Sequence, residues 1–412
     1  MSGLPEWRRL LGSGVSLTGG AVTQAAIGLV AQLILMRLLM PEDFGSFAIT
    51  MATCSLVQMV LSLRLNVMII RATDAELTAE RCKRYRAALV WETVASAAVT
   101  LTWFALADLL TPFSLVLVLS LSLGQWTNQE VAFYERRMAY GRIVMVESGA
   151  QVFGHMLALA LANIGAGAGA LYVRELVVAL LRLLSFARIG ALAAPVWRMP
   201  TLAELRPLMT EARTLWLDGV LEGGIARVVI LGAGLHGQYW VGIFAQSLRL
   251  ATIPHQLAAP TLVRMGANMF SRLSDPLARR HLLRRLLTAA LVALTAAALV
   301  AVALSGPVIP TVLGEHWRPA VPVFRAMAGV VVFFSCFELL RAYCVSQHLM
   351  RPVLMARLSQ YAVFLTALGT VWLVALKDGD AIGLLALALS ATYAVPFAIL
   401  AMALRSAQAR GQ

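Results

Sequence analysis

The chain has 412 residues, of which 60% are apolar and only 13% are charged. Ordinary soluble domains carry about 25% charged residues, so this composition excludes a water-soluble protein. The formal net charge of +13 could indicate nucleic-acid binding, but membrane topology and anionic lipid headgroups account for it, and we expect no nucleic-acid partner.

Twelve segments are long and apolar enough to span a membrane, which needs about 20 residues as a helix. They are residues 13–36, 46–70, 87–107, 113–130, 143–163, 168–188, 213–234, 239–262, 286–305, 320–344, 353–376 and 381–404. The sequence therefore predicts an all-α polytopic membrane protein with about 12 transmembrane helices.

Basic residues concentrate in alternate gaps between these segments. Of the 34 Lys and Arg residues, 24 lie in such gaps or in the two tails, and the intervening gaps hold only Arg37, Arg318 and Lys377. Because basic residues accumulate in cytoplasmic loops, the rich gaps and both termini are expected in the cytoplasm. One cytoplasmic stretch, 272–285, has arginines and leucines spaced as in an amphipathic surface helix, although a solvated basic loop is an equal alternative.

The longest cytoplasmic gap divides the spans into two groups of six. We expect an N-terminal six-helix bundle at 1–190, a linker at 191–212 and a C-terminal bundle at 213–412. A weak Gly-x-aromatic match at Gly45 and Gly237 supports an internal repeat. Six spans return the chain to the same side of the membrane, so the bundles would form a parallel repeat with the ligand site between them.

Seven arginines fall inside the apolar segments, where a cation costs at least about 3 kcal/mol. They are Arg64, Arg174, Arg182, Arg227, Arg249, Arg325 and Arg341. The acids inside or near the spans are Glu92, Glu147, Glu175, Asp218, Glu222 and Glu338. Glu338 and Arg341 share a helix face and are expected to pair, and Glu147 is expected to pair with Arg174 or Arg182.

No catalytic set is recognisable in the sequence. The chain has no Gly-rich phosphate loop for ATP and no cluster of metal ligands among its six scattered histidines. Three of the four cysteines lie in apolar spans. We therefore expect a protein that is not an enzyme and that has no cofactor and no metal site.

Three stretches resemble the Wzx-type lipid-linked oligosaccharide flippases of the multidrug/oligosaccharidyl-lipid/polysaccharide (MOP) exporter superfamily. The run RLLMPEDFGSFA at 37–48 resembles the loop after the first span in these proteins, and residues 231–239 and 312–322 resemble parts of their second halves. The likeness extends over nearly the whole chain in order and span count. It implies a bacterial inner-membrane protein that moves an undecaprenyl-pyrophosphate-linked oligosaccharide between leaflets by alternating access, for O-antigen, capsule or exopolysaccharide synthesis.

The resemblance also implies where the substrate binds. In these flippases the first, second, seventh and eighth spans line the cavity between the lobes, and here those spans supply Arg64, Arg227 and Arg249. Guanidinium groups match phosphate oxygens in bidentate fashion, so these arginines are candidates for holding the diphosphate. A polysaccharide polymerase and chain-length proteins are possible partners.

The loop motif at 37–48 also has a structural interpretation. Arg37, Pro41, Asp43, Phe44 and Gly45 can anchor and start the second span. We therefore expect these residues to serve the scaffold, with direct substrate contact as the alternative.

Two acids in the seventh predicted span are candidates for coupling transport to an energy source. Family members often carry an acid near the position of Arg227, and Asp218 and Glu222 could instead couple transport to a proton or sodium ion.

Two other functions stay open. A small-molecule or multidrug antiporter of the same superfamily would share the fold but would need an acidic or aromatic cavity. A membrane polysaccharide polymerase would need a large outward loop, and the outward gaps here are short.

Overall fold

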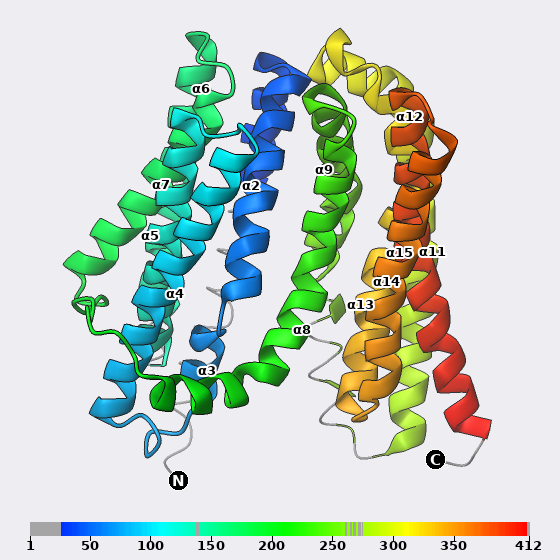
Figure 1. Cartoon of the computed structure of the whole chain (residues 1–412). Coiled ribbons are helices and arrows are strands. Elements are labelled where there is room, and N and C mark those ends of the chain that lie inside the picture. The colour runs from blue at the N-terminus through cyan, green and yellow to red at the C-terminus, as the bar shows by residue number, and fades with distance from the viewer. Residues whose placement is uncertain are drawn as a thin grey trace. The chain divides into compact units, whose positions relative to one another are not determined.

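The computed structural model describes residues 26–136, 140–259, 262–263, 266, 269–270, 273 and 275–409. Within these ranges the regular elements are helices, and each predicted span overlaps with helical residues (Figure 1). Residues 13–25 of the first predicted span and 260–261 of the eighth lie outside the described residues. The chain divides into two compact units. Unit 1 contains residues up to Leu39 and Thr50–Arg227, and unit 2 contains Met40–Ile49 and the residues from Val228 onward.

Unit 1 is built from a bundle of helices that α5 and α7 hold together. α7 packs on α5 and α6, while α4 and α3 pack on α5. The elements are a helix at Ala26–Leu38, most of α2 (Pro41–Leu61), α3 (Leu65–Arg71), α4 (Ala79–Leu106), α5 (Pro112–Glu135), α6 (Tyr140–Asn163), α7 (Gly169–Arg188) and the first part of α8 (Leu202–Gly234).

Capping residues fix where two of these helices begin. The Thr78 hydroxyl accepts a hydrogen bond from the Arg81 N–H at the start of α4. Thr111 and Ser114 form a reciprocal capping box at the start of α5, where Pro112 occupies the first turn. These groups satisfy backbone donors that have no partner inside the helix.

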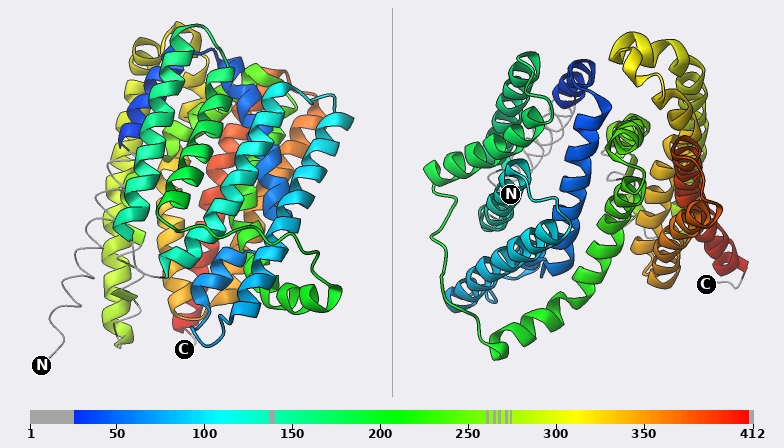
Figure 2. Two further views of the ribbon diagram at one scale, coloured as in Figure 1. Left: turned by 90° about the vertical axis from the view of Figure 1, so that its left-hand side faces the viewer. Right: turned by 45° about the horizontal axis from the view of Figure 1, so that its top comes forward.

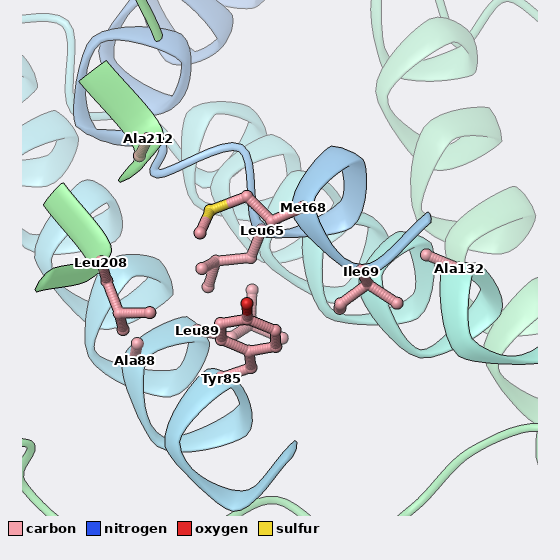
Figure 3. Packing of buried hydrophobic residues seen from close by; sticks show 9 residues of the cluster. All are labelled: Leu65, Met68, Ile69, Tyr85, Ala88, Leu89, Ala132, Leu208 and Ala212. Carbon is pink, nitrogen blue, oxygen red and sulfur yellow. The ribbon is translucent and has the colours of Figure 1, made fainter. Parts of the chain in front are cut away.

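A hydrophobic cluster in unit 1 joins α3, α4, α5 and the beginning of α8. Figure 3 shows Leu208 and Ala212 of α8 beside the side chains of α3 and α4. Tyr85 and Ile69 in this cluster are completely buried. The first turns of α8 are therefore fixed to unit 1 through one apolar face.

Unit 2 is a second helical bundle, in which α13 and α15 are central. α15 packs on α14, α13 and α12, and α13 also packs on α11 and α9. Its elements are the last part of α8, α9 (Gln238–Ala259), α11 (Pro276–Leu313), η2 (Glu315–Trp317), α12 (Ala320–Ala326), α13 (Ala328–Ser346), α14 (Met350–Val374) and α15 (Asp378–Ala409).

In the basic stretch at 272–285, residues 273 and 275 are non-helical and residues 276–285 belong to a longer helix, while 272 and 274 lie outside the described residues. α11 begins at Pro276 and continues without interruption to Leu313. The Asp275 carboxylate caps this helix by accepting from the N–H groups of Leu277 and Ala278. Residues 276–285 are thus the first turns of a long membrane helix.

The second predicted span, 46–70, is not one helix. α2 ends at Leu61 and α3 begins at Leu65, and Arg64 between them adopts a left-handed backbone with φ of 56°. The tenth span, 320–344, is likewise divided, between α12 and α13. Hydropathy averages over such breaks, because one to three residues change the mean of a span of about 20 only slightly.

Seven helices in the described part of the chain are long and apolar enough to cross a membrane, and Ala26–Leu38 is a shorter apolar helix. α5, α7, α8 and α9 are not among the seven. Many large apolar side chains are exposed on the helices, including Leu106, Met145 and Trp372. Such surfaces are compatible with lipid rather than water, which agrees with the predicted polytopic membrane fold.

The residues that connect the two predicted bundles are partly helical. Residues 189–201 form an extended connection after α7, which Figure 2 shows, and α8 then begins at Leu202. The second half of the expected linker is therefore continuous with the seventh predicted span. The division into bundles at 1–190 and 213–412 stays a prediction.

Candidate functional site

Unit 1 encloses a polar cavity of about 640 Å³. Residues of α2 to α8 contribute to its walls, and α5, α7 and α8 supply many of the polar groups. The composition of α5, α7 and α8 is too polar for them to count among the seven candidate membrane spans. Their polar residues line this cavity, which explains that composition. The polar and charged lining residues are Ser55, Gln58, Ser62, Arg64, Asn66, Glu92, Ser120, Gln125, Asn128, Gln129, Gln151, Glu175, Arg182, Glu222 and Arg227.

The break between α2 and α3 forms part of the cavity wall. The Leu63 N–H donates to Glu92 Oε2 at 3.0 Å, and Gln125 Nε2 donates to Glu92 Oε1 at 2.6 Å. The Ser62 hydroxyl donates to the same carboxylate and accepts from the Arg64 N–H at 3.1 Å. Glu92 is only 8% exposed, so a buried carboxylate stabilises the non-helical turn.

Arg64 follows directly from this break. Its guanidinium lies against α8 at Gly219, where a Cβ atom would be 2.8 Å from Arg64 Cζ. The glycine therefore provides the space that the side chain occupies. The buried Arg64 Nε has no hydrogen-bond partner in the described part of the chain, and the residue lines the cavity.

Arg227 is the second predicted cation in the cavity. Its Nε donates to Ser55 Oγ at 3.4 Å, and its Nη1 donates to the Gly223 carbonyl at 2.9 Å. Both acceptors are neutral, so these two bonds orient the guanidinium without neutralising its charge.

Two other charged residues of the cavity, Arg182 and Glu175, form ion pairs. Arg182 contacts Glu147 at 2.7 Å and the Asn128 side-chain oxygen at 2.6 Å, and Glu175 contacts Arg174 at 3.2 Å. The expected pairing of Glu147 with an arginine is confirmed, with Arg182 as its partner.

In unit 2, the expected pair of Glu338 and Arg341 is also confirmed, at 2.7 Å. The sequence missed a second partner, since Arg357 contacts the other oxygen of Glu338 at 3.1 Å. Arg357 lies inside α14 and is 5% exposed.

The structure brings together some of the predicted site residues and separates others. Arg64, Arg227 and Glu222 line the same cavity, whereas Asp218 and Arg249 are not among its lining residues. Arg249 lies on α9 in unit 2 and is exposed. The part played by Glu92 and Gln125 was missed, because their contacts with the α2–α3 break depend on tertiary structure.

From Met40 onward, the motif residues at the start of α2 belong to unit 2 and make packing contacts there. Asp43 Oδ2 accepts from the Met40 N–H at 3.0 Å, and Phe44 packs edge-on against the buried Trp317 with centroids 5.7 Å apart. Pro41 and Gly45 are buried, and Arg37 is exposed on the helix before them.

Gly45 and Gly242 allow the backbones of α2 and α9 to touch. A Cβ atom at Gly45 would be 1.7 Å from the Gln238 carbonyl oxygen, and one at Gly242 would be 1.8 Å from the Pro41 oxygen. The contact is reciprocal and pairs Gly45 with Gly242. Gly237, which the sequence matched with Gly45, instead precedes α9 with φ of 91°.

No group of three or more His, Cys, Asp or Glu side chains that could hold a metal ion is found among the described residues. The chemistry available in the cavity is therefore that of guanidinium, carboxylate, amide and hydroxyl groups.

Solved structures with the same fold are membrane flippases and transporters. A lipid II flippase, MurJ, in an inward closed conformation has a TM-score of 0.74 at 11% identity, covering 94% of this chain and 87% of that protein. An inward-facing multidrug resistance MATE family transporter of the MOP superfamily has a TM-score of 0.61 at 15% identity, covering 95% and 98%. A mutant of the Vibrio cholerae MATE transporter VcmN has a TM-score of 0.55 at 15% identity and covers 97% of each chain.

The match to a sequence family is more specific than these likenesses of fold. No curated protein matches the chain. The family of polysaccharide biosynthesis proteins matches residues 34–322, which include the loop motif, the α2–α3 break and Arg227. The predicted resemblance to Wzx-type proteins is thereby confirmed, and the chain belongs to the polysaccharide biosynthesis protein family, with the fold of MOP superfamily flippases and transporters.

Proposed function

We propose that this protein is a flippase that translocates an undecaprenyl-pyrophosphate-linked oligosaccharide across the bacterial inner membrane for O-antigen, capsule or exopolysaccharide synthesis. The observation that carries this proposal is the polar cavity of unit 1, where Arg64 and Arg227 both lie. The family match to polysaccharide biosynthesis proteins supports the substrate class.

The cavity offers what a diphosphate requires. Arg64 and Arg227 both line it, and hydrogen bonds to Ser55 and the Gly223 carbonyl orient the Arg227 guanidinium. Guanidinium groups form charge-assisted hydrogen bonds with phosphate oxygens. Amide side chains such as Gln58, Asn66 and Gln151 on the cavity wall can bond sugar hydroxyls.

Transport in one direction needs an energy source. The proposed coupling groups are Asp218 and Glu222, one helical turn apart on α8, with Glu222 on the cavity wall. Binding of a proton or sodium ion there would remove negative charge next to the substrate anion. If neutralising both acids leaves transport unchanged across imposed gradients, this coupling is excluded.

Complementation of a flippase-deficient bacterial strain tests the proposal. The parent chain should restore surface glycan, and Arg64→Ala with Arg227→Ala should abolish it, while the exposed Arg188→Ala serves as control. Arg249→Ala tests the third predicted cation separately. Surface glycan that persists unchanged in the Arg64/Arg227 variant would remove the cavity from the proposal but leave the family function intact.

A multidrug antiporter is the second candidate, because the fold resembles that of a MATE transporter and the cavity also carries Glu92, Glu175 and Glu222. Carboxylates favour cationic substrates. Drug resistance on overexpression, without restored glycan, would favour this function. A polymerase would instead require polymerisation of lipid-linked repeat units by the purified protein.

A further inference from the structure

A second cavity of unit 1 is apolar and lies beside the α2–α3 break. It has a volume of about 890 Å³, which is within the usual range of about 300–1,000 Å³ for ligand pockets. One wall is formed by residues 60–63 and the other by the first half of α8. Ser62 is the residue that this groove shares with the polar cavity.

The groove follows from the way α8 packs. Leu208 and Ala212 point into the hydrophobic cluster of Figure 3. Leu202, Met209 and Trp216, spaced seven residues apart on another face of α8, line the groove. Leu202 and Met209 are 86% and 58% exposed, so this apolar face is not covered by the protein.

A hydrogen bond closes one end of the groove. Trp216 Nε1 donates to the Val60 carbonyl at 2.7 Å. Because α2 ends at Leu61, this carbonyl has no partner within its own helix, and the indole supplies one. This hydrogen bond therefore joins the two walls of the groove, α8 and the end of α2.

Two arginines border this apolar surface. Arg206 and Arg213 line the groove seven residues apart on α8, about 10 Å along a helix axis. The nearby acids are used elsewhere, since Glu204 contacts Arg198 at 2.6 Å and Glu211 contacts Arg81 at 2.8 Å.

Within the described ranges, the guanidinium groups of Arg206 and Arg213 have no hydrogen bond or ion pair, and at Arg206 the Thr210 hydroxyl donates to the backbone carbonyl at 2.9 Å. Their positive charges are uncompensated at the edge of an exposed apolar groove.

We infer that this groove binds a phospholipid with an anionic headgroup, whose phosphate contacts Arg206 and Arg213 and whose acyl chain lies against Leu202, Met209 and Trp216. Uncompensated guanidinium groups complement the phosphate, and the apolar wall complements a hydrocarbon chain. A soluble anion would leave that wall exposed. The site differs from the proposed substrate cavity and does not depend on the proposed function.

Lipid titration of the purified, delipidated full-length protein, followed by native mass spectrometry, tests the site. Phosphatidylglycerol should bind more tightly than phosphatidylcholine with the same chains. Arg206→Gln with Arg213→Gln should raise the Kd for phosphatidylglycerol about tenfold and leave that for phosphatidylcholine unchanged. Met209→Trp, which fills the groove without changing charge, should weaken the binding of both lipids.

Arg71→Gln with Arg188→Gln removes the same charge from exposed positions outside the groove and should have no effect. The inference is overturned if this control weakens binding as much as the groove variant, or if glycerol phosphate competes as well as the lipid. It is also overturned if the groove variants lose affinity for undecaprenyl phosphate while phosphatidylglycerol binding is unchanged, because the groove would then hold an isoprenoid chain.

Discussion

The backbone N–H of Leu63 donates a hydrogen bond to the Glu92 carboxylate at 3.0 Å, which ties the interruption of the second span to α4. Such a turn leaves backbone groups without helical partners, and inside a membrane each unsatisfied group costs several kcal/mol. Glu92 supplies the acceptor, and the break places Arg64 at the polar cavity.

Replacing Glu92 by Leu should destabilise unit 1. The Leu63 N–H and the Gln125 amide would each lose an acceptor, and we expect a loss of about 1–3 kcal/mol in the free energy of unfolding. Thermal unfolding in detergent would measure it. Glu80→Leu, at an exposed position of the same helix, is the control and should change stability little. Equal stability of the parent and Glu92→Leu would show that the carboxylate does not hold the break.

Gly45→Ala and Gly242→Ala should each disrupt the contact between α2 and α9. The added Cβ would be less than 2 Å from a backbone oxygen in both cases. Overpacking that only backbone movement can relieve should cost about 1–3 kcal/mol or more.

Gly149→Ala is the matched control for these two variants. Gly149 is an exposed glycine inside α6, and a Cβ there would meet nothing within 4 Å. Alanine should be neutral or should stabilise by up to about 1 kcal/mol. Expression yield and melting temperature would compare the three variants, and equal values would refute the close approach.

Glu338→Gln should destabilise unit 2 strongly. Glu338 is 7% exposed and forms ion pairs with both Arg341 and the buried Arg357. Removal of one partner from a buried ion pair costs about 3–5 kcal/mol. Glu315 and Arg318 form an exposed pair with the same sequence spacing, so Glu315→Gln should barely change the melting temperature. Similar melting temperatures for the two variants would contradict this account.

The start of α8 should loosen at acidic pH. Hydrogen bonds from the Thr201 N–H and from Arg198 hold the pKa of Glu204 below its usual range. A carboxyl whose pKa is lowered on folding stabilises the structure at pH above its unfolded pKa, about 4.3, and this contribution is lost as the pH falls through the folded pKa. Hydrogen exchange at residues 198–206 should be faster in Glu204→Gln than in the parent at pH 7. The difference should become smaller as the pH falls below the unfolded pKa of about 4.3, and a difference that grows towards acidic pH would refute the role of Glu204.

Cysteine labelling should report the predicted topology. In a background where the four native cysteines are serine, Glu315→Cys lies in a predicted outward gap and Glu80→Cys in a predicted cytoplasmic gap. An impermeant maleimide should label the first in intact cells and the second only after permeabilisation. The opposite pattern would invert the orientation.

More of the fold than of the contacts between helices could be predicted from the sequence. Helix positions follow from long apolar segments, and the pair Glu338–Arg341 follows from a three-residue spacing on one helix. Arg357 could not be assigned to Glu338, because these residues are 19 positions apart on different helices.

The sequence alone determined that this chain is a helical membrane protein with polar groups inside its spans, because the lipid environment imposes length and hydropathy on every spanning helix. Only the tertiary structure decided which of those polar groups share a cavity. Arg64 and Arg227 both line that cavity. Arg64 is placed there because α2 ends at Leu61, Glu92 holds the turn, and Gly219 leaves space for a guanidinium. These are contacts between helices distant in the chain, which no periodicity along a single helix can encode.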